Sequence, residues 1–298
     1  MTEPIEHIED LPALASRRRD GHKGDYGRVR VGGGSRGMVG AVSLAASAAL
    51  RGGAGLVTFA APETIQLAAA TLCPCATSIP LACDAEGLLA AGSVRQVRKA
   101  AGAADVLAVG PGMATGTRQC DLVRAALEQA KCVVLDADGL NNLAAIDGWP
   151  AARQAPLVLT PHPGEFSRLT GRSIGEIQAD REAAAVAAAR QWRQAGPDEL
   201  PLVVLLKGAG TVVTDGRRVR INRTGNPGMA TGGSGDVLTG LLAALLAQGL
   251  GAFEAASLAA HLHGRAGDLA AERLSEPAVI ATDLLDFLPA AMAEHLSA

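Results

Sequence analysis

The chain has 298 residues, of which 48% are hydrophobic and only 2% aromatic, so a large core must be built from Ala, Leu, Val and Ile. The net charge of −3 argues against a nucleic-acid-binding surface. No apolar run reaches the length of a membrane span, and the start, MTEPIEHIEDLPAL, carries early acids rather than the apolar stretch of a signal peptide, so we expect a cytoplasmic protein. The five cysteines contain no CxxC pair, so we expect neither disulfides nor structural zinc.

Short apolar runs alternate with helical patterns through the first two thirds of the chain. Strands are predicted over 28–32 and 55–62, with a helix over 40–53 between them. Further strands begin the segments DVLAVGPG, CVVLDAD, PLVLTPHPGE and LVVLLKGAG. Continuous apolar strands indicate a sheet covered on both faces, and the strand–helix alternation indicates mostly parallel pairing with right-handed crossovers.

The last third of the chain changes pattern. The Asp215-Gly216 turn between two β-type runs predicts a hairpin, and therefore a locally antiparallel part of the sheet. Two alanine-rich helices are predicted near 234–248 and 251–273. We find no linker and no repeat. The sequence therefore predicts a single domain over residues 1–298 with an α/β fold, a three-layer α/β/α sandwich around a mostly parallel sheet.

A glycine-rich loop follows the first long strand. In VRVGGGSRGMVGA, Gly32, Gly34 and Gly37 match the GxGxxG pattern of dinucleotide-binding domains, and Glu63 could serve as the ribose acid. The chain has 36 glycines, so a tight turn that needs backbone freedom fits equally well. We prefer a third interpretation, in which this loop touches a ligand without being a dinucleotide fingerprint.

Four turns are expected to gather at one edge of the sheet. They are GPG (110–112), DADGLN (136–141), TPHPGE (160–165) and KGAGT (207–211), and each follows a strand. Ligands of open parallel sheets bind beyond the carboxyl ends of the strands. Lys207 could counter phosphate charge there, and Glu165 could hold a magnesium ion through water.

Several residues of these turns also have structural interpretations. Asp136 and Asp138 could cap the next helix. His162 lies between two prolines, which favours an extended backbone and makes a capping or core role less expected. His261 and His263 stand two apart on a predicted helix and point to different faces, so packing or helix-surface roles are expected rather than a metal pair.

The segment TGGSGD precedes a long apolar helix. The start of that helix exposes unpaired N–H groups and the positive end of the helix dipole, which together form an anion site. Gly232, Gly233 and Gly235 allow phosphate oxygens to approach. Asp236 could accept a proton from a hydroxyl that attacks a terminal phosphate. Alternatively, its charge stabilises the first helical turn by about 1 kcal/mol.

The order of these motifs resembles a known family. GGSGD-VLTG after a hairpin resembles the ribokinase-like superfamily, whose GxGD aspartate is the base and whose glycines form the anion hole. TPHPGE resembles its N-x-x-E element, with His162 in place of the asparagine and Glu165 at the position of the magnesium-organising glutamate. More specifically, residues 15–290 resemble the ADP-dependent NAD(P)H-hydrate dehydratases through HKGDYGRVRVGGG, MVGA, AVGPG, LTPHPGEFSRLTG, LKGAGTVV and NPGMATGGSGDVLTGLLAALLAQG.

The resemblance implies an enzyme that dehydrates the S-epimer of hydrated NADH and NADPH, with ADP (ATP being possible) and Mg²⁺. It implies that the hydrate contacts Ala41, Gly112, His162 and Asp236, with Asp236 catalytic. It implies that the adenine nucleotide contacts Lys207, Gly208, Ala209, Gly210, Thr211, Gly233, Ser234 and Gly235. The family's DADALN reads DADGLN here, and Gly139 leaves no named contact in doubt.

Partners and alternative functions follow from the same comparison. Many bacterial relatives carry an epimerase domain before this one, and the short segment before HKGDYG leads us to expect a stand-alone dehydratase with a separate, functionally linked epimerase. A homo-oligomer, such as a homotetramer, is expected. The main alternative is a small-alcohol kinase of the same superfamily, followed by a non-catalytic nucleotide sensor and a dehydrogenase that uses GGGSRG.

Overall fold

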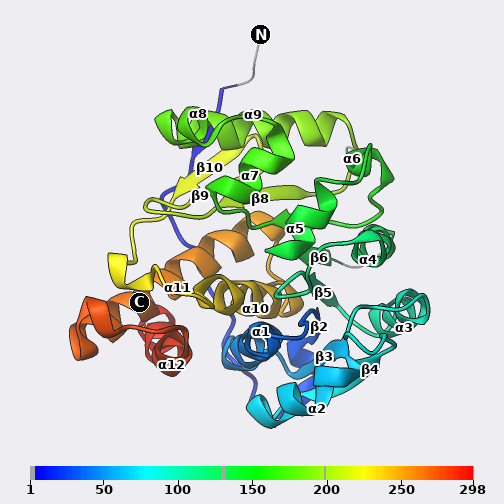
Figure 1. The fold of residues 1–298 in the computed structure, drawn as a ribbon. Coiled ribbons are helices and arrows are strands. Elements are labelled where there is room, and N and C mark those ends of the chain that lie inside the picture. Colours follow the sequence, from blue (N-terminus) through cyan, green and yellow to red (C-terminus); the bar gives the residue numbers. More distant parts are fainter. Residues whose placement is uncertain (1–3, 129–131, 198, 298) are drawn as a thin grey trace.

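The computed structural model describes residues 4–128, 132–197 and 199–297 (Figure 1). These residues form one ten-stranded sheet with the order β1-β10-β9-β8-β7-β6-β5-β2-β3-β4. The strands are β1 (Glu6–His7), β2 (Arg28–Gly32), β3 (Leu56–Pro62), β4 (Thr77–Leu81), β5 (Val106–Val109), β6 (Cys132–Leu135), β7 (Leu157–Leu159), β8 (Leu202–Leu206), β9 (Val212–Thr214) and β10 (Arg218–Ile221). Strand β9 is antiparallel to β8 and β10, and every other neighbouring pair is parallel.

Helices cover both faces of this sheet. They are α1 (Val39–Arg51), α2 (Glu63–Leu72), α3 (Gly92–Ala101), α4 (Thr117–Leu127), α5 (Asp138–Leu143), α6 (Trp149–Ala152), α7 (Pro163–Thr170), α8 (Ile174–Ala179), α9 (Arg181–Gln194), α10 (Ser234–Ala247), α11 (Ala252–Leu274) and α12 (Ala281–Ser297), with short 3₁₀ helices η1 (Lys23–Tyr26), η2 (Pro227–Met229) and η3 (Glu276–Ala278). One core cluster joins the sheet to α1, α2, α10, α11 and α12, and the other joins it to α3 through α9. The three-layer α/β/α prediction is therefore confirmed.

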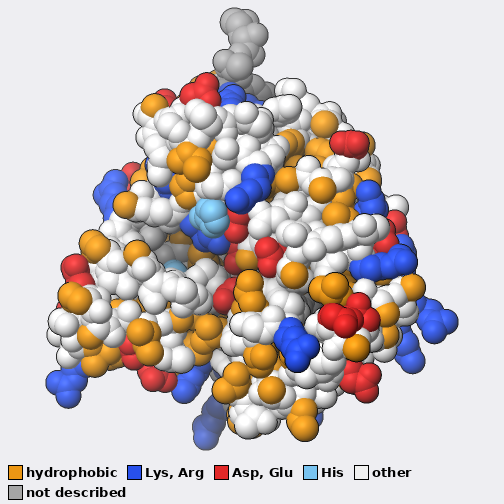
Figure 2. All heavy atoms as spheres, viewed as in Figure 1, with side chains coloured by type: hydrophobic (Ala, Val, Ile, Leu, Met, Phe, Trp, Pro, Cys, Tyr) orange, Lys and Arg blue, Asp and Glu red, His pale blue; other side chains and the backbone are white. Residues whose placement is uncertain are grey.

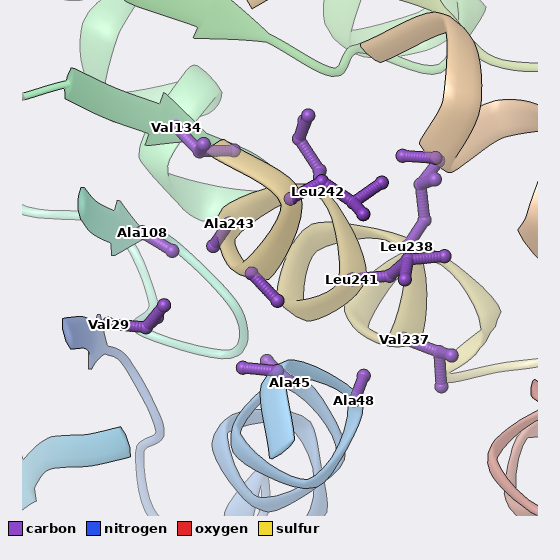
Figure 3. Packing of buried hydrophobic residues seen from close by; sticks show 14 of the residues in the cluster. Val29, Ala45, Ala48, Ala108, Val134, Val237, Leu238, Leu241, Leu242 and Ala243 are labelled. Atoms are coloured by element: carbon purple, nitrogen blue, oxygen red, sulfur yellow. The ribbon is translucent and has the colours of Figure 1, made fainter. Parts of the chain in front are cut away.

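The central strands are buried on both faces, which explains their uninterrupted apolar sequences. In β6, Val133 and Leu135 belong to the cluster on one face and Val134 to the cluster on the other. Because successive strand side chains point to opposite faces, both faces need apolar residues. Figure 3 shows Val134 and Ala108 from the strands pointing toward Ala243 and Leu242 of α10.

Helices α1 and α10 pack very closely against each other. Ala45 and Ala48 of α1 face α10 (Figure 3). A Cβ added to Gly240 of α10 would overlap the carbonyl oxygen of Ala45 and lie 2.9 Å from the Cβ of Ala48. Only a residue without a side chain fits there, so this glycine permits the two backbones to approach.

The predicted elements agree with the structure in the centre of the fold. The hairpin at Asp215-Gly216 is the antiparallel pair β9–β10, and the helices near 234–248 and 251–273 are α10 and α11. The edge strands β1 and β4 and the C-terminal helix α12 were not anticipated. None of the helices in the described ranges combines the length and the apolar character that crossing a bilayer requires. All five cysteines are free.

Candidate active site

The loops that follow β5, β6, β7 and β8 meet the amino end of α10 at the carboxyl edge of the sheet. A Cβ built on Gly235 in the first turn of α10 would lie 3.2 Å from Lys207 Nζ and 3.6 Å from Asp136 Oδ2. Lys207 follows β8, and its backbone N–H donates to the carbonyl of Pro161 after β7 at 2.8 Å. Figure 2 shows histidine, acidic and basic side chains gathered around a hollow near the middle of this face.

The amino end of α10 has no side-chain cap, and the N–H of Ser234 makes a long hydrogen bond of 3.4 Å to the Thr231 carbonyl. The helix begins at Ser234, as predicted, and its N-cap residue Gly233 has a φ of 94°, a left-handed conformation that glycine adopts without strain. Gly233 provides no side chain to bond the first N–H groups, which have no acceptor within the helix. Asp236 lies in this first turn. The geometry therefore fits an anion site beside a carboxylate.

Lys207 forms a buried ion pair at the base of this site. Its Nζ lies 2.5 Å from Asp136 Oδ1 and 3.9 Å from Glu165 Oε2. Asp136 is 1% exposed, and its Oδ2 accepts a hydrogen bond from Thr239 Oγ1 of α10 at 2.6 Å. Lys207 thus lies where its ammonium group could contact a phosphate, and in this structure it is paired with the carboxylate of Asp136.

The proposed capping roles of Asp136 and Asp138 are wrong. The N-cap of α5 is Ala137, without a side-chain cap bond. Asp138 is the first helical residue, and its Oδ2 accepts from the N–H of Ala114 at 2.9 Å. Asn142 also binds this loop, because its Nδ2 donates to the Ala114 carbonyl at 2.9 Å. The two side chains fix the loop after β5, and Asp136 serves the ion pair.

His162 does cap a helix, contrary to the expectation from its flanking prolines. It is the N-cap of α7, and its Nδ1 accepts a hydrogen bond from Gly164 N–H at 2.9 Å. Glu165 completes a capping box, since its Oε2 accepts a hydrogen bond from the backbone N–H of His162 at 2.8 Å. The extended backbone that Pro163 imposes (φ −79°, ψ 167°) is itself the N-cap conformation. The ring remains half-exposed, so capping leaves it accessible to a ligand.

The electrostatics of the site favour proton transfer near neutral pH. Burial, together with the charge of Asp136, raises the pKa of Asp236 from 3.8 to about 7. Burial also raises the pKa of Glu165 to about 7. Burial opposes the charge on Lys207, but the carboxylates of Asp136 and Glu165 outweigh it and raise its pKa. Such shifts are typical of acid–base catalysts.

Two of the predicted hydrate contacts lie side by side. A Cβ added to Gly112, whose φ is 63°, would lie 2.9 Å from the Cβ of Ala41 at the start of α1. The glycine-rich loop after β2 packs against the same turn, because Gly34 N–H donates to the Pro111 carbonyl at 2.7 Å. The loops after β2 and β5 therefore form one continuous wall.

The KGAGT segment (207–211) begins at the site with Lys207 and continues on the surface of the protein. Gly208, Ala209 and Gly210 are exposed, and Thr211 Oγ1 donates to the Gly208 carbonyl at 2.9 Å. Arg181 of α9 supports the beginning of the segment, since its Nη2 donates to the carbonyls of Leu206 at 3.0 Å and Lys207 at 3.1 Å. Of this segment, Lys207 is the residue that lies against the start of α10.

Sequence reasoning missed several residues that support the site. Thr239, Arg181 and the ion-pair role of Asp136 carry no local sequence signal, because their partners are distant in the chain. His263 was expected to pack or to lie on a helix surface. It is buried, and its Nε2 bonds the Ser234 carbonyl at 2.9 Å. Burial lowers the pKa of His263 to about 4, so it is a neutral donor that holds the first residue of α10.

The donor set fits a hydrated magnesium ion rather than a closed metal cage. Within the described ranges, no three His, Cys, Asp or Glu side chains are close enough to hold a metal ion by themselves. Magnesium usually keeps several waters and takes its other ligands from one or two carboxylates and substrate phosphates. Glu165, 4% exposed at the edge where the anion site lies, fits a contact made through water.

Comparison with known proteins agrees with this geometry. The family model described as NAD(P)H-hydrate dehydratase matches residues 29–290. The chain is 47% identical to the bifunctional NAD(P)H-hydrate repair enzyme Nnr of Moorella thermoacetica over 281 residues, which is 93% of this chain and 51% of that protein. It thus spans about half the length of the curated relatives it matches.

Solved structures are similar over nearly the whole chain. The ADP/ATP-dependent NAD(P)H-hydrate dehydratase of Bacillus subtilis, co-crystallised with ATP and Mg²⁺, has a TM-score of 0.79, 30% identity and 95% coverage of both chains. A ribokinase-like superfamily protein of Enterococcus faecalis has a TM-score of 0.80 at 24% identity, covering 99% of this chain and 97% of that one, which supports the fold. By its matched residues, fold and site geometry, the chain belongs to the NAD(P)H-hydrate dehydratase family.

Proposed function

We propose that this protein dehydrates hydrated NADH and NADPH, restoring the reduced cofactors at the expense of an adenine nucleotide. The observation that carries the proposal is the position of Asp236. Asp236, whose pKa is raised to about 7, lies in the first turn of α10, next to Gly235, where an added Cβ would lie 3.2 Å from Lys207 Nζ. The same edge carries Ala41, Gly112 and His162. Family membership and the nucleotide named for the Bacillus subtilis relative support this assignment.

The chemistry starts from a leaving-group problem. The hydrate carries a hydroxyl on its reduced nicotinamide ring, and hydroxide leaves poorly. Asp236 takes the proton of this hydroxyl while the hydroxyl oxygen attacks the terminal phosphorus of the nucleotide. The bond from that phosphorus to the rest of the nucleotide breaks, so ADP leaves as AMP and the hydrate carries the phosphate. The amides of Gly233, Ser234 and Gly235 stabilise the charge on the phosphoryl oxygens, together with Lys207. The lone pair of the ring nitrogen then expels inorganic phosphate, the adjacent ring carbon loses a proton, and NAD(P)H is restored.

The nucleotide is proposed to be ADP, with ATP as the alternative, and the substrate to be the S-epimer of the hydrate. When bound, Mg²⁺ would neutralise part of the charge of the phosphates. Glu165 would hold it through water. The amide groups at the start of α10 and the exposed backbone of 208–210 would receive the nucleotide.

Partners and assembly follow from the same proposal. Since only the S-epimer is consumed, a separate epimerase that interconverts the two hydrates would be linked functionally to this protein. The residues 1–298 would act as one dehydratase domain, and copies of the chain would associate as a homo-oligomer, such as a homotetramer, in the cytoplasm.

The decisive experiment incubates the protein with hydrated NADH plus ADP or ATP, side by side, and follows the return of the absorbance of the reduced ring. We expect recovery with stoichiometric release of phosphate. Asp236→Ala should fold normally and lose about 10²-fold or more in rate, as for removal of a general base. Near-wild-type turnover of that variant would reject the role of Asp236. A small-alcohol kinase would instead leave the hydrate unchanged.

A further inference from the structure

Asp136 joins three separate elements of the site through a single buried carboxylate. It follows β6, and one oxygen binds Lys207 Nζ after β8, 71 residues away in sequence, at 2.5 Å. The other oxygen accepts from Thr239 Oγ1 in the second turn of α10, 103 residues away, at 2.6 Å. At 1% exposure the carboxylate has almost no contact with solvent. The Thr239 contact lies within the range of charge-assisted O–H···O⁻ hydrogen bonds, and the Lys207 contact is shorter than the usual range for an ammonium and a carboxylate.

A buried ion pair at this position calls for an explanation beyond stability. Burying two charges costs desolvation free energy that their mutual attraction often fails to offset. Apolar residues of similar volume at such a position are often as stabilising as the ion pair, or more so. The pair lies directly under Gly235, where an added Cβ would be 3.2 Å from Lys207 Nζ. The ammonium is therefore held within contact distance of the helix turn that would receive phosphate.

Without Asp136 the ammonium has another carboxylate to approach. Glu165 lies 3.9 Å from Lys207 Nζ at the start of α7. The lysine side chain is flexible, and its position follows its strongest partner. Loss of the Asp136 charge would thus let Nζ leave its present position and move toward Glu165. Thr239 resists this movement indirectly, because its hydroxyl orients the Asp136 carboxylate.

We propose that Asp136 is a positioning residue of the reaction, which fixes the Lys207 ammonium beneath the first turn of α10, where the polyphosphate of the nucleotide would lie. The inference rests on the proposed function and deepens it. A charge fixed in advance needs no reorganisation when the phosphoryl group moves, and this preorganisation is the main source of electrostatic catalysis. Asp136 is 1% exposed and has both carboxylate oxygens bonded within the protein, so its role is exerted through Lys207.

The first test compares three single variants in the NADH-recovery assay. Asp136→Asn keeps the shape and removes the charge, and we expect kcat to fall about 10²-fold with the KM of the hydrate unchanged. Thr239→Val keeps the ion pair and should cost less, about 10-fold. Thr58→Val is the matched control, because Thr58 is also buried, lies in β3 outside the loops of the site, and has its hydroxyl 2.6 Å from that of Thr77. It should retain wild-type kcat.

The second test is a double-mutant cycle of Asp136→Asn and Lys207→Met. The charge of Asp136 also raises the pKa of Asp236, so the cycle is measured at about pH 9, above that pKa, to minimise this second effect. If Asp136 acts through Lys207, adding Asp136→Asn to the Lys207→Met variant causes no further loss of kcat. If the double variant instead loses kcat by the product of the two single losses, the proposal is overturned. It is also overturned if Asp136→Asn has the kcat of wild type. Circular dichroism and melting temperature report folding, and if Asp136→Asn fails to fold, the cycle of Thr239→Val with Lys207→Met decides in the same way.

Failure of the proposed function is recognised separately. In that case the wild-type chain restores no NADH with either nucleotide. The cycle is then read on the affinity for ADP, measured by titration calorimetry. Coupling between Asp136 and Lys207 in ADP affinity supports the positioning role, and additive effects, or no effect of Asp136→Asn, overturn it.

Discussion

Replacing the proposed base should make the folded protein more stable while inactivating it. Asp236→Asn keeps the shape of the side chain and removes its ionisation. In the native protein, burial and the charge of Asp136 raise the pKa of Asp236 from 3.8 to about 7. Folding therefore opposes the ionised form, and the carboxylate destabilises the native state wherever it is charged. An uncharged amide is free of this cost.

The size and pH dependence of the gain follow from the shift. At about 1.4 kcal/mol for each pKa unit, the shift corresponds to at most about 4 kcal/mol. Because the side chain is partly exposed, we expect about 1–2 kcal/mol. Below about pH 4 the Asp236 carboxyl is protonated in both the native and the unfolded state, so its ionisation adds little to the difference in unfolding free energy between wild type and Asp236→Asn. As the pH rises from about 4 to about 7, the native state retains a proton that the unfolded state has lost, so wild type loses stability relative to the variant.

Urea denaturation of both proteins at about pH 5 and about pH 8 measures this difference, since the midpoint and slope give the free energy of unfolding. The advantage of Asp236→Asn should be clearly larger at the higher pH. Asp20→Asn serves as the control, because Asp20 is 84% exposed and should show no such trend. A variant that is equally stable or less stable than wild type at about pH 8 would refute the argument that burial raises the pKa of Asp236.

Three further variants test the supports of the site. His162→Ala should raise the KM of the hydrate and lower stability by about 1 kcal/mol, whereas His162→Asn keeps a capping side chain and should restore the stability alone; an unchanged KM in the alanine variant would remove His162 from the substrate pocket. His263→Phe should lower kcat and cost about 1–3 kcal/mol in urea denaturation, because the buried Ser234 carbonyl loses its donor; wild-type kcat would contradict the role of this bond. Gly110→Ala should lower the melting temperature far more than Gly37→Ala, since an added Cβ would overlap the Asp136 carbonyl at the first position and meets nothing within 4 Å at the second; equal shifts would contradict the close approach.

The sequence predicted the centre of the fold well because those signals are local. Apolar strands, helix periodicity and the Asp215-Gly216 turn each depend on neighbouring residues. The edge strand β1 has two residues, Glu6 and His7, and owes its existence to pairing with β10, more than two hundred positions later. No local pattern marks such a strand, so tertiary pairing alone creates it.

The sequence indicated which residues lie at the site better than it indicated which partners their side chains bind. Asp236, Lys207 and Glu165 stand at strand and helix ends, and the fold brings such ends together. The partners of Asp136 are not visible in this way, because an aspartate directly before a helix looks like a cap. His162 was misjudged for the opposite reason, since the extended backbone that argued against capping is the conformation that an N-cap requires.

The close packing of α1 against α10 connects a predicted hydrate contact with the proposed base. Ala41, a predicted hydrate contact, is on α1, and Asp236 is on α10, and Gly240 holds the two helices at a fixed spacing. The distance between these two helices is therefore set by the contact of Gly240 with the Ala45 carbonyl. A methyl group added at Gly240 would overlap the Ala45 carbonyl, push the two helices apart, and so move Ala41 away from the proposed base Asp236.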